Sequence, residues 1–175
     1  MKLGNIFAIF TALALVFLPS CLGDSDTPGY DYSEWYMLNQ QYVDSIEQVT
    51  ENGALVYKKI VPVWDKSIFV LMKWINNPEE NTNELTPLST STITVKYTLT
   101  TVEGDTLDAN SSYQLQPCNM VTGFWAAVTN MHVNDTVNVV IPYAAGYGDS
   151  GYGSVPPYST LIFGIRLDSI DKLFD

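Results

Sequence analysis

Positive charge is scarce in this sequence, which has 8 Lys and Arg residues against 19 Asp and Glu residues and a formal net charge of −11. Proteins that bind nucleic acid neutralise phosphates with Lys and Arg, so this composition argues against a nucleic-acid partner. It also argues against an electrostatic attraction to anionic lipid headgroups. Any link between this chain and a membrane is therefore expected to be covalent.

Histidine and cysteine are also scarce, with one His and two Cys in the whole chain. No second His, Cys pair or acidic cluster accompanies His132, so we expect no metal site and no cofactor. The glycine-rich segment 146–153 does not match a phosphate-binding loop, because no Lys follows it and no helical pattern starts there. If Cys21 is modified, Cys118 can form no intrachain disulfide, and we expect it to be a small buried apolar side chain.

A run long enough to span a membrane is missing. The apolar segment Ile6–Leu18, interrupted by Thr11, is shorter than the roughly 20 apolar residues that a transmembrane helix needs. It has the length of the apolar region of a signal peptide, and Lys2 supplies the positive charge that precedes such a region.

This apolar segment ends in Leu18–Cys21, which resembles the lipobox of bacterial lipoproteins, although Pro19 is unusual at its position. We therefore predict that residues 1–20 are a signal peptide and that Cys21 becomes lipidated. The lipid would anchor the chain to a membrane of the bacterial cell envelope, with the outer membrane favoured and the folded part outside the cytoplasm. The alternatives are an ordinary secretory signal with a chance cysteine, and a retained membrane anchor.

The rest of the chain is predicted to be one domain with an N-terminal extension, and its hydrophobic content of 46% suffices for a core. Residues 21–32 are rich in Gly, Asp, Ser and Pro, which indicates a flexible tether. Residues 33–66 are predicted to be a helix and strand extension, and residues 67–175 the main domain.

In the extension, apolar residues at helical spacing predict a helix over about 33–49, with Asp31 and Glu34 as a capping box and Asn52-Gly53 as its stop. Segments 55–63 and 67–75 are β-rich, with a possible turn at 64–66, and the polar segment 76–87 reads as a loop. The apolar helical positions are Trp35, Leu38, Tyr42, Ile46 and Val49.

In the second half, apolar and polar residues alternate over 93–99, 137–141 and 161–167, which predicts strands with one buried face. A short helix is indicated between Phe124 and Met131, and a glycine- and tyrosine-rich loop over 143–157. This pattern predicts an α+β fold.

Six short motifs resemble, in order and spacing, those of the FKBP-type peptidyl-prolyl cis-trans isomerase family. They are Ile93–Thr98, Glu103–Asp108, Val121–Phe124, Met131–Asp135, Val140–Gly148 and Val155–Phe163. The resemblance implies an antiparallel sheet wrapped around a short helix. It also implies that the chain is a rotamase that acts on X-Pro segments, and the predicted lipoprotein signal makes exported polypeptides the expected substrates.

Prolyl isomerisation makes and breaks no covalent bond. Its barrier of about 18–20 kcal/mol comes from the amide resonance that is lost during rotation. A catalyst therefore needs only to bind the twisted amide better than either planar form. An apolar aromatic site suits this task, because a twisted amide is less dipolar than a planar one. No general base is needed, which agrees with a chain that has a single histidine.

By the same resemblance, Phe124 is the floor under the proline ring and Tyr147 donates its hydroxyl to a substrate carbonyl. Asp108 lies beside the rotating amide, held by a hydrogen bond from Tyr97. The implied catalytic residues are Tyr97, Asp108, Tyr147 and Phe163. The implied substrate-binding residues are Leu107, Tyr113, Leu115, Met120, Val121, Phe124 and Val155.

Three of these positions depart from the family pattern, because Phe124 replaces a usual Trp, while Leu107 and Leu115 replace Phe. Leu107, Val121, Phe124 and Phe163 would also be ordinary core residues in any β domain. The alternative is therefore a non-catalytic FKBP-like binding or chaperone module of a cell-envelope assembly, with the helix at 35–42 as a docking surface. A third reading, a β-rich carbohydrate-binding lipoprotein, accounts for the aromatics but not for the ordered motifs.

Overall fold

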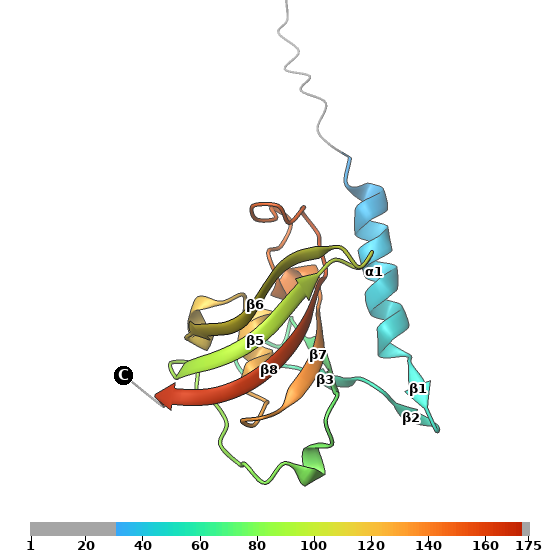
Figure 1. Ribbon diagram of the computed structural model, residues 1–175. Coiled ribbons are helices and arrows are strands. Elements are labelled where there is room, and N and C mark those ends of the chain that lie inside the picture. Colours follow the sequence, from blue (N-terminus) through green and yellow to red (C-terminus); the bar gives the residue numbers. More distant parts are fainter. Residues whose placement is uncertain (1–30, 173–175) are drawn as a thin grey trace, which may run out of the picture. The chain divides into compact units, whose positions relative to one another are not determined.

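The computed structural model describes residues 31–172, which form a six-stranded antiparallel sheet, a separate two-stranded hairpin and two α-helices. The six strands lie in the order β3-β4-β7-β8-β5-β6 (Figure 1). The elements are α1 (Ser33–Glu47), β1 (Thr50–Glu51), β2 (Ala54–Leu55), β3 (Lys58–Ile60), β4 (Val70–Trp74), β5 (Thr92–Thr100), β6 (Thr106–Leu115), α2 (Thr122–Val128), β7 (Thr136–Ile141) and β8 (Leu161–Lys172). Single 3₁₀ turns lie at η1 (Pro78–Glu80), η2 (Pro117–Asn119) and η3 (Tyr143–Ala145).

The inner face of the sheet packs on α2 and forms the main hydrophobic core. Side chains on successive strand residues point to opposite faces, so Ile93, Val95, Tyr97 and Leu99 of β5 all turn inward and are buried. A Cβ atom built at Gly123, at the start of α2, would lie only 2.3 Å from Cγ2 of Ile141. A glycine is therefore needed there for α2 to approach β7 closely.

The outer face of the same sheet carries α1. Val43 of α1 packs with Leu71 of β4 and Val140 of β7, and this small cluster is separate from the main core. The neighbouring residues Val70 and Ile141 point to the inner face, as the alternation along a strand requires. The sheet is therefore covered by a helix on each side where β4 and β7 lie.

The alternation over 93–99, 137–141 and 161–167 correctly predicted β5, β7 and β8, and the predicted α+β sheet wrapped on a short helix is confirmed. β6 was not predicted as a strand. Most of its side chains are exposed on both faces of this edge strand, so it shows no apolar alternation.

The helix predicted over about 33–49 is confirmed as α1, but several local details of the extension were predicted wrongly. The helix ends at Glu47, two residues before Val49, and Asn52-Gly53 forms the turn of the β1–β2 hairpin with φ of 51° and 82°. The capping box does not form, since the N-cap is Tyr32 and Asp31 instead accepts a hydrogen bond from the Ser33 N–H at 2.9 Å.

The predicted strands at 55–63 and 67–75 are real but much shorter, as β3 and β4 show. Pro62 has no N–H for a ladder bond. Beyond it, Asp65 accepts hydrogen bonds from both the N–H and the hydroxyl of Ser67, at 2.9 and 2.6 Å. This local turn competes with strand pairing and lengthens the connection between β3 and β4.

Cys118 was predicted to be buried, and this was wrong, because it is exposed on the 3₁₀ turn η2. In that turn the buried residue is Pro117. The predicted signal peptide 1–20, the lipidation site Cys21 and most of the tether 21–32 lie outside the described residues. Within residues 31–172, neither α-helix is long and apolar enough to cross a membrane.

Candidate functional site

Aromatic side chains from α2, β8, β5 and β6 form a continuous series on the inner face. Phe124 of α2 is fully buried, and its ring meets that of Phe163 of β8 edge to face, with centroids 5.3 Å apart. The ring centroids of Phe163 and Tyr97 are 6.1 Å apart, and those of Tyr97 and Tyr113 are 5.9 Å apart. Tyr113 is 40% exposed, so the series runs from the core to the surface.

A tyrosine–carboxylate pair lies beside this series. Leu99 of β5 pairs with Asp108 of β6, and opposed residues of antiparallel strands point to the same side, so Asp108 shares the inner face with Tyr97. The Tyr97 hydroxyl donates a hydrogen bond to Oδ2 of Asp108 at 2.6 Å, as expected from the sequence. Oδ1 of Asp108 accepts a bond from the Ala109 N–H at 2.8 Å. Both carboxylate oxygens are therefore oriented.

Burial, followed by the hydrogen bond to Asp108 and its negative charge, raises the pKa of Tyr97 far above its ordinary value. The Tyr97 hydroxyl therefore stays protonated at any physiological pH and acts as a permanent donor. Asp108 itself is exposed, so its free lone pairs can meet solvent or a ligand.

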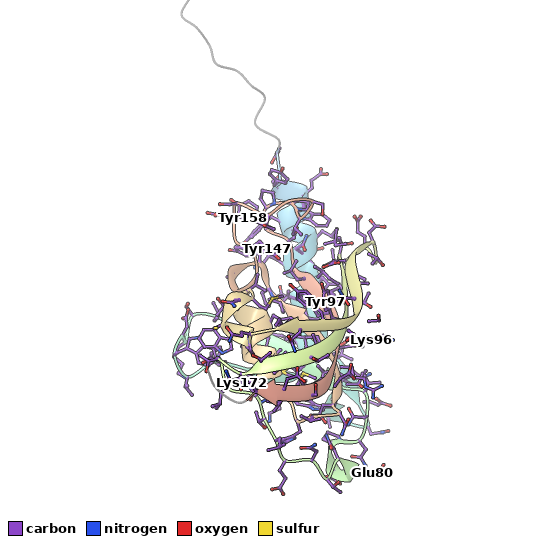
Figure 2. The ribbon with its side chains drawn as sticks, turned by 60° about the vertical axis from the view of Figure 1, so that its left-hand side comes forward. Glu80, Lys96, Tyr97, Tyr147, Tyr158 and Lys172 are labelled. Atoms are coloured by element: carbon purple, nitrogen blue, oxygen red, sulfur yellow. The ribbon has the colours of Figure 1, made fainter. Side chains whose placement is uncertain are left out.

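Tyr147 lies on the loop that follows η3. Gly148 adopts a φ of 68° and donates its N–H to the carbonyl of Tyr143 at 2.9 Å, while its own carbonyl accepts the N–H of Tyr158 at 2.9 Å. The ring of Tyr147 stacks on that of Tyr152, with centroids 5.2 Å apart and planes at 18°. Figure 2 labels Tyr147 between Tyr158 and Tyr97 in that view.

Burial raises the pKa of Tyr147, and the neighbouring Tyr152 and the charge of Asp108 raise it further. Tyr97 and Tyr147 belong to the same hydrophobic cluster, and Asp108 accepts the hydroxyl of Tyr97, so the three groups lie in one region. The Tyr147 hydroxyl makes no hydrogen bond to any residue within 31–172. It is therefore a neutral donor available to a ligand.

The structure brings the other candidate residues to the same place. All of the predicted catalytic and substrate-binding residues except Asp108 and Tyr113 belong to one hydrophobic cluster, and those two contact Tyr97 directly. In that cluster Leu115 and Val155 are buried, whereas Leu107, Met120 and Val121 are partly buried at its margin. None of these catalytic and substrate-binding residues, all of which lie within 31–172, is on a distant part of the fold.

Two features near the site were not predicted. The first is the stack of Tyr152, which is 71% exposed, on Tyr147. The second is the contact between α1 and the loop that carries Tyr147, made through the buried Asn39. A signal for the second existed in the sequence, because position 39 lies four residues from Trp35 and Val43 on the same helix face, where a polar residue is uncommon.

The arrangement offers an apolar aromatic floor, one oriented carboxylate and one free hydroxyl. Within residues 31–172, no group of three or more His, Cys, Asp and Glu side chains lies close enough together to hold a metal ion. These groups can hold an amide and donate a hydrogen bond to it, without taking part in bond making or breaking.

Residues 84–168 match the family model described as FKBP-type peptidyl-prolyl cis-trans isomerase. Two relatives come from Escherichia coli K12. The FKBP-type peptidyl-prolyl cis-trans isomerase FkpA is 29% identical over 86 residues, which cover 46% of this chain and 32% of that protein. The FKBP-type 22 kDa peptidyl-prolyl cis-trans isomerase is 34% identical over 86 residues, with 46% and 42% covered. The aligned part thus spans about a third of the first relative and about two fifths of the second.

Solved structures share the fold. A peptidyl-prolyl cis-trans isomerase from Pseudomonas syringae superposes with a TM-score of 0.67 at 18% identity, over 81% of this chain and 96% of that chain. The crystal structure of Escherichia coli FkpA gives a TM-score of 0.64, also at 18% identity, over 77% and 58%. Together with the motifs, the sheet wrapped on α2 and the family match, these findings show that residues 84–168 of this chain form a domain of the FKBP family.

Proposed function

We propose that this chain is a peptidyl-prolyl cis-trans isomerase that acts on X-Pro bonds of extended polypeptide segments. The observation that carries the proposal is the grouping of three features at one place. These are the oriented carboxylate of Asp108, the unpaired hydroxyl of Tyr147 and the aromatic floor of Phe124 and Phe163. The family match over 84–168 supports the same activity.

The floor would lie beneath the proline ring, which would approach it past the partly buried Leu107, Met120 and Val121 because Phe124 itself is fully buried. A buried aromatic surface excludes water, and a twisted amide is less dipolar than a planar one, so an apolar environment favours the rotating form. Phe124 stands where the family usually has Trp, so the floor is smaller but still presents an aromatic ring. A thousandfold acceleration requires only about 4 kcal/mol of preference for the twisted amide.

The polar groups would act on the amide carbonyl. Tyr147 would donate its hydroxyl to a carbonyl oxygen of the bound segment. Asp108, fixed by Tyr97 and the Ala109 N–H, would lie beside the rotating bond. The raised pKa values of Tyr97 and Tyr147 keep both hydroxyls protonated, so both remain donors throughout the cycle.

The test is an isomerisation assay on a proline-containing peptide, coupled to a protease that cleaves only the trans form. The full chain, purified in detergent, is expected to accelerate isomerisation above the rate in buffer. A rate equal to buffer, with a normal thermal melt, would contradict the enzyme proposal. In that case a non-catalytic binding or chaperone module of a cell-envelope assembly is the better interpretation.

The argument for a binding module that came from the helix around Trp35 and Tyr42 is weakened by the contacts of that helix. The sequence suggested that the helix around Trp35 and Tyr42 presents a docking surface to a partner. In the structure Trp35 donates a hydrogen bond to Ser159 of this same domain, and Tyr42 packs beside the cluster under α1. The smaller floor at Phe124 remains the feature that favours a binding module with a reduced catalytic rate.

We also propose that the chain is exported and lipid-anchored in the bacterial cell envelope, where its substrates are X-Pro segments of exported polypeptides. The support is the apolar segment Ile6–Leu18 followed by the motif Leu18–Cys21. Labelling cells with a fatty-acid analogue is expected to mark the natural chain and not Cys21→Ala. Cys118→Ala, which keeps the motif, serves as the control and should be labelled normally. Equal labelling of Cys21→Ala would contradict the anchor.

A further inference from the structure

The helix α1 contacts both ends of the loop that carries Tyr147. At one contact, Nε1 of Trp35 donates a hydrogen bond to Oγ of Ser159 at 3.1 Å. The Ser159 hydroxyl in turn donates to the carbonyl of Pro156 at 2.7 Å. Ser159 is itself buried, so this chain of bonds connects α1 to the loop in partial shelter from solvent.

Asn39 makes the second contact and is fully buried. Its Oδ1 accepts the backbone N–H of Thr160 at 2.6 Å, and its Nδ2 donates to the carbonyl of Trp35 at 2.8 Å. A buried N–H that loses its acceptor is costly, so Asn39 fixes the point at which the loop enters β8. Phe163 of the aromatic floor follows Thr160 by three residues on that strand.

The third contact is a cluster of three tyrosines. The ring of Tyr36 on α1 meets those of Tyr143 and Tyr158 edge to face, at 5.8 and 5.4 Å, and the latter two rings are 5.5 Å apart. Tyr158 has a φ of 62°, in the left-handed region that non-glycine residues rarely adopt. Its neighbours must hold it there, and Tyr36 is one of them.

These contacts enclose the backbone around Tyr147. The N–H of Tyr158 bonds to the carbonyl of Gly148, and the N–H of Gly148 bonds to the carbonyl of Tyr143. Both tyrosines that Tyr36 touches are therefore hydrogen-bonded to the residue that follows Tyr147. If the three tyrosine rings move apart, Gly148 is expected to move with the backbone of Tyr143 and Tyr158, and Tyr147 with Gly148.

We propose that α1 is a positioning element of the isomerase site, in which Tyr36 and Asn39 hold the loop so that the Tyr147 hydroxyl is directed at the bound amide. This proposal rests on the isomerase function proposed above. The two residues touch no substrate and act through the loop. The other end of α1, where Val43 packs on Leu71 and Val140, attaches the helix to the sheet and has no such role.

The test compares Tyr36→Ala and Asn39→Ala with Val43→Ala in the full chain, measuring kcat, KM and thermal melts. Tyr36→Ala and Asn39→Ala should lower kcat by about threefold to tenfold with little change in KM, the range expected for loss of one hydrogen bond in the transition state. Tyr36→Phe keeps the ring contacts and loses only the hydroxyl that bonds to Tyr143, so it should keep kcat closer to wild type than Tyr36→Ala does. Val43→Ala should lower the melting temperature while kcat stays within about twofold of wild type.

A double variant tests whether Tyr36 acts on kcat through the Tyr147 hydroxyl. If Tyr36 acts through the Tyr147 hydroxyl, Tyr36→Ala should have little further effect on kcat in a Tyr147→Phe background, since coupled residues are not additive. Three results would overturn the proposal: normal kcat in Tyr36→Ala and Asn39→Ala, an equal loss of kcat in Val43→Ala, or full additivity with Tyr147→Phe. No acceleration by the unmodified chain would overturn the isomerase proposal as well, so the two failures are distinguishable.

Discussion

The two helices cover opposite faces of one sheet and contribute to the molecule in different ways. α2 has 7 residues, of which Gly123, Phe124, Ala126, Ala127 and Val128 are buried, so almost the whole helix is core. α1 has 15 residues, and only Asn39 and Val43 are buried. The inner helix thus supplies hydrophobic burial, whereas the outer helix attaches at a few points. We expect α2 to determine stability, and α1 to have a smaller effect on stability.

The largest effect is expected at Phe124. Phe124→Ala removes a fully buried ring that packs on Phe163, and should lower the free energy of unfolding by about 3–5 kcal/mol. Denaturant unfolding measures this change. A loss of activity in this variant would not be specific to the site, because the substitution disturbs the core as well as the floor. A destabilisation below about 2 kcal/mol would contradict the importance given to α2.

The turn after α2 is held by Asp135, which is fully buried. Burial raises the pKa of Asp135, but bonds from the His132 N–H and from Asn81, Trp74 and Asn76 outweigh it, so the pKa is below its ordinary value. Asp135→Asn replaces an acceptor by a group that donates, and should cost about 2–4 kcal/mol at pH 7.

The sign of the pH dependence follows from that depressed pKa. The stability that Asp135 contributes is present above the pKa of the unfolded state, about 3.9, and is lost as the pH falls through the lower folded value. Thermal melts from pH 7 down to pH 3 should therefore show a smaller acid-induced loss in Asp135→Asn than in wild type. Asp149→Asn, at an exposed loop position, is the control and should behave like wild type.

Substitution of Asp108, which lies between the core and the surface, tests its proposed role in catalysis. Asp108→Leu removes the acceptor of the Tyr97 hydroxyl and the charge beside the proposed amide position. A hydrogen bond to a charged group contributes about 1.5–3 kcal/mol, which corresponds to a loss of about tenfold to a hundredfold in kcat/KM. Peptide isomerisation assays measure it. Activity equal to wild type would contradict the site assignment while leaving the family assignment in place.

On the outer face, Val43→Ala should lower the free energy of unfolding by about 1–2 kcal/mol, because it removes two methyl groups from a small cluster with Leu71 and Val140. Denaturant unfolding is again the measurement. A decrease in the free energy of unfolding as large as that of Phe124→Ala would contradict the conclusion that α2 contributes more to stability than α1.

The smallest energetic change is expected for Tyr147→Phe, which deletes one hydroxyl and keeps the stack on Tyr152. The expected loss in kcat/KM is about threefold to tenfold, since one neutral hydrogen bond contributes about 0.5–1.5 kcal/mol. The melting temperature should stay unchanged, because the hydroxyl bonds to no residue within 31–172. A lower melting temperature with unchanged kcat/KM would mean that Tyr147 is only a packing residue.

The sequence predicted best where one face of an element is buried. β5 and β8 each bury one face, and β7 alternates up to Val140, which is buried under α1, so the alternation reveals these strands. β6 is exposed on both faces and was not recognised. The burial of Cys118 was wrongly predicted from the usual behaviour of free cysteines, because the adjacent Pro117 occupies the inner position.

The site was predictable to the extent that short motifs carry it. The Tyr97–Asp108 bond joins residues eleven apart on paired strands, so it follows once the strand pairing is known. The contact of Asn39 with Thr160 spans 121 positions and depends on where α1 docks. The polar residue at position 39 of an apolar helix face signals a buried contact, but no local pattern identifies Thr160 as its partner, so the role we propose for α1 emerged only from the structure.

The order of the strands has a consequence for synthesis. β8, the last strand, lies between β7 and β5 and pairs with both along its length. Until β8 emerges from the ribosome, β3, β4 and β7 form one ribbon and β5 and β6 another, with no strand to join them. Of the site's aromatic groups, Tyr97 and Tyr113 belong to the β5–β6 ribbon and Phe163 to β8 itself. Co-translational folding of the sheet therefore cannot be completed before the final strand is made, and long-range pairing of this kind is slow.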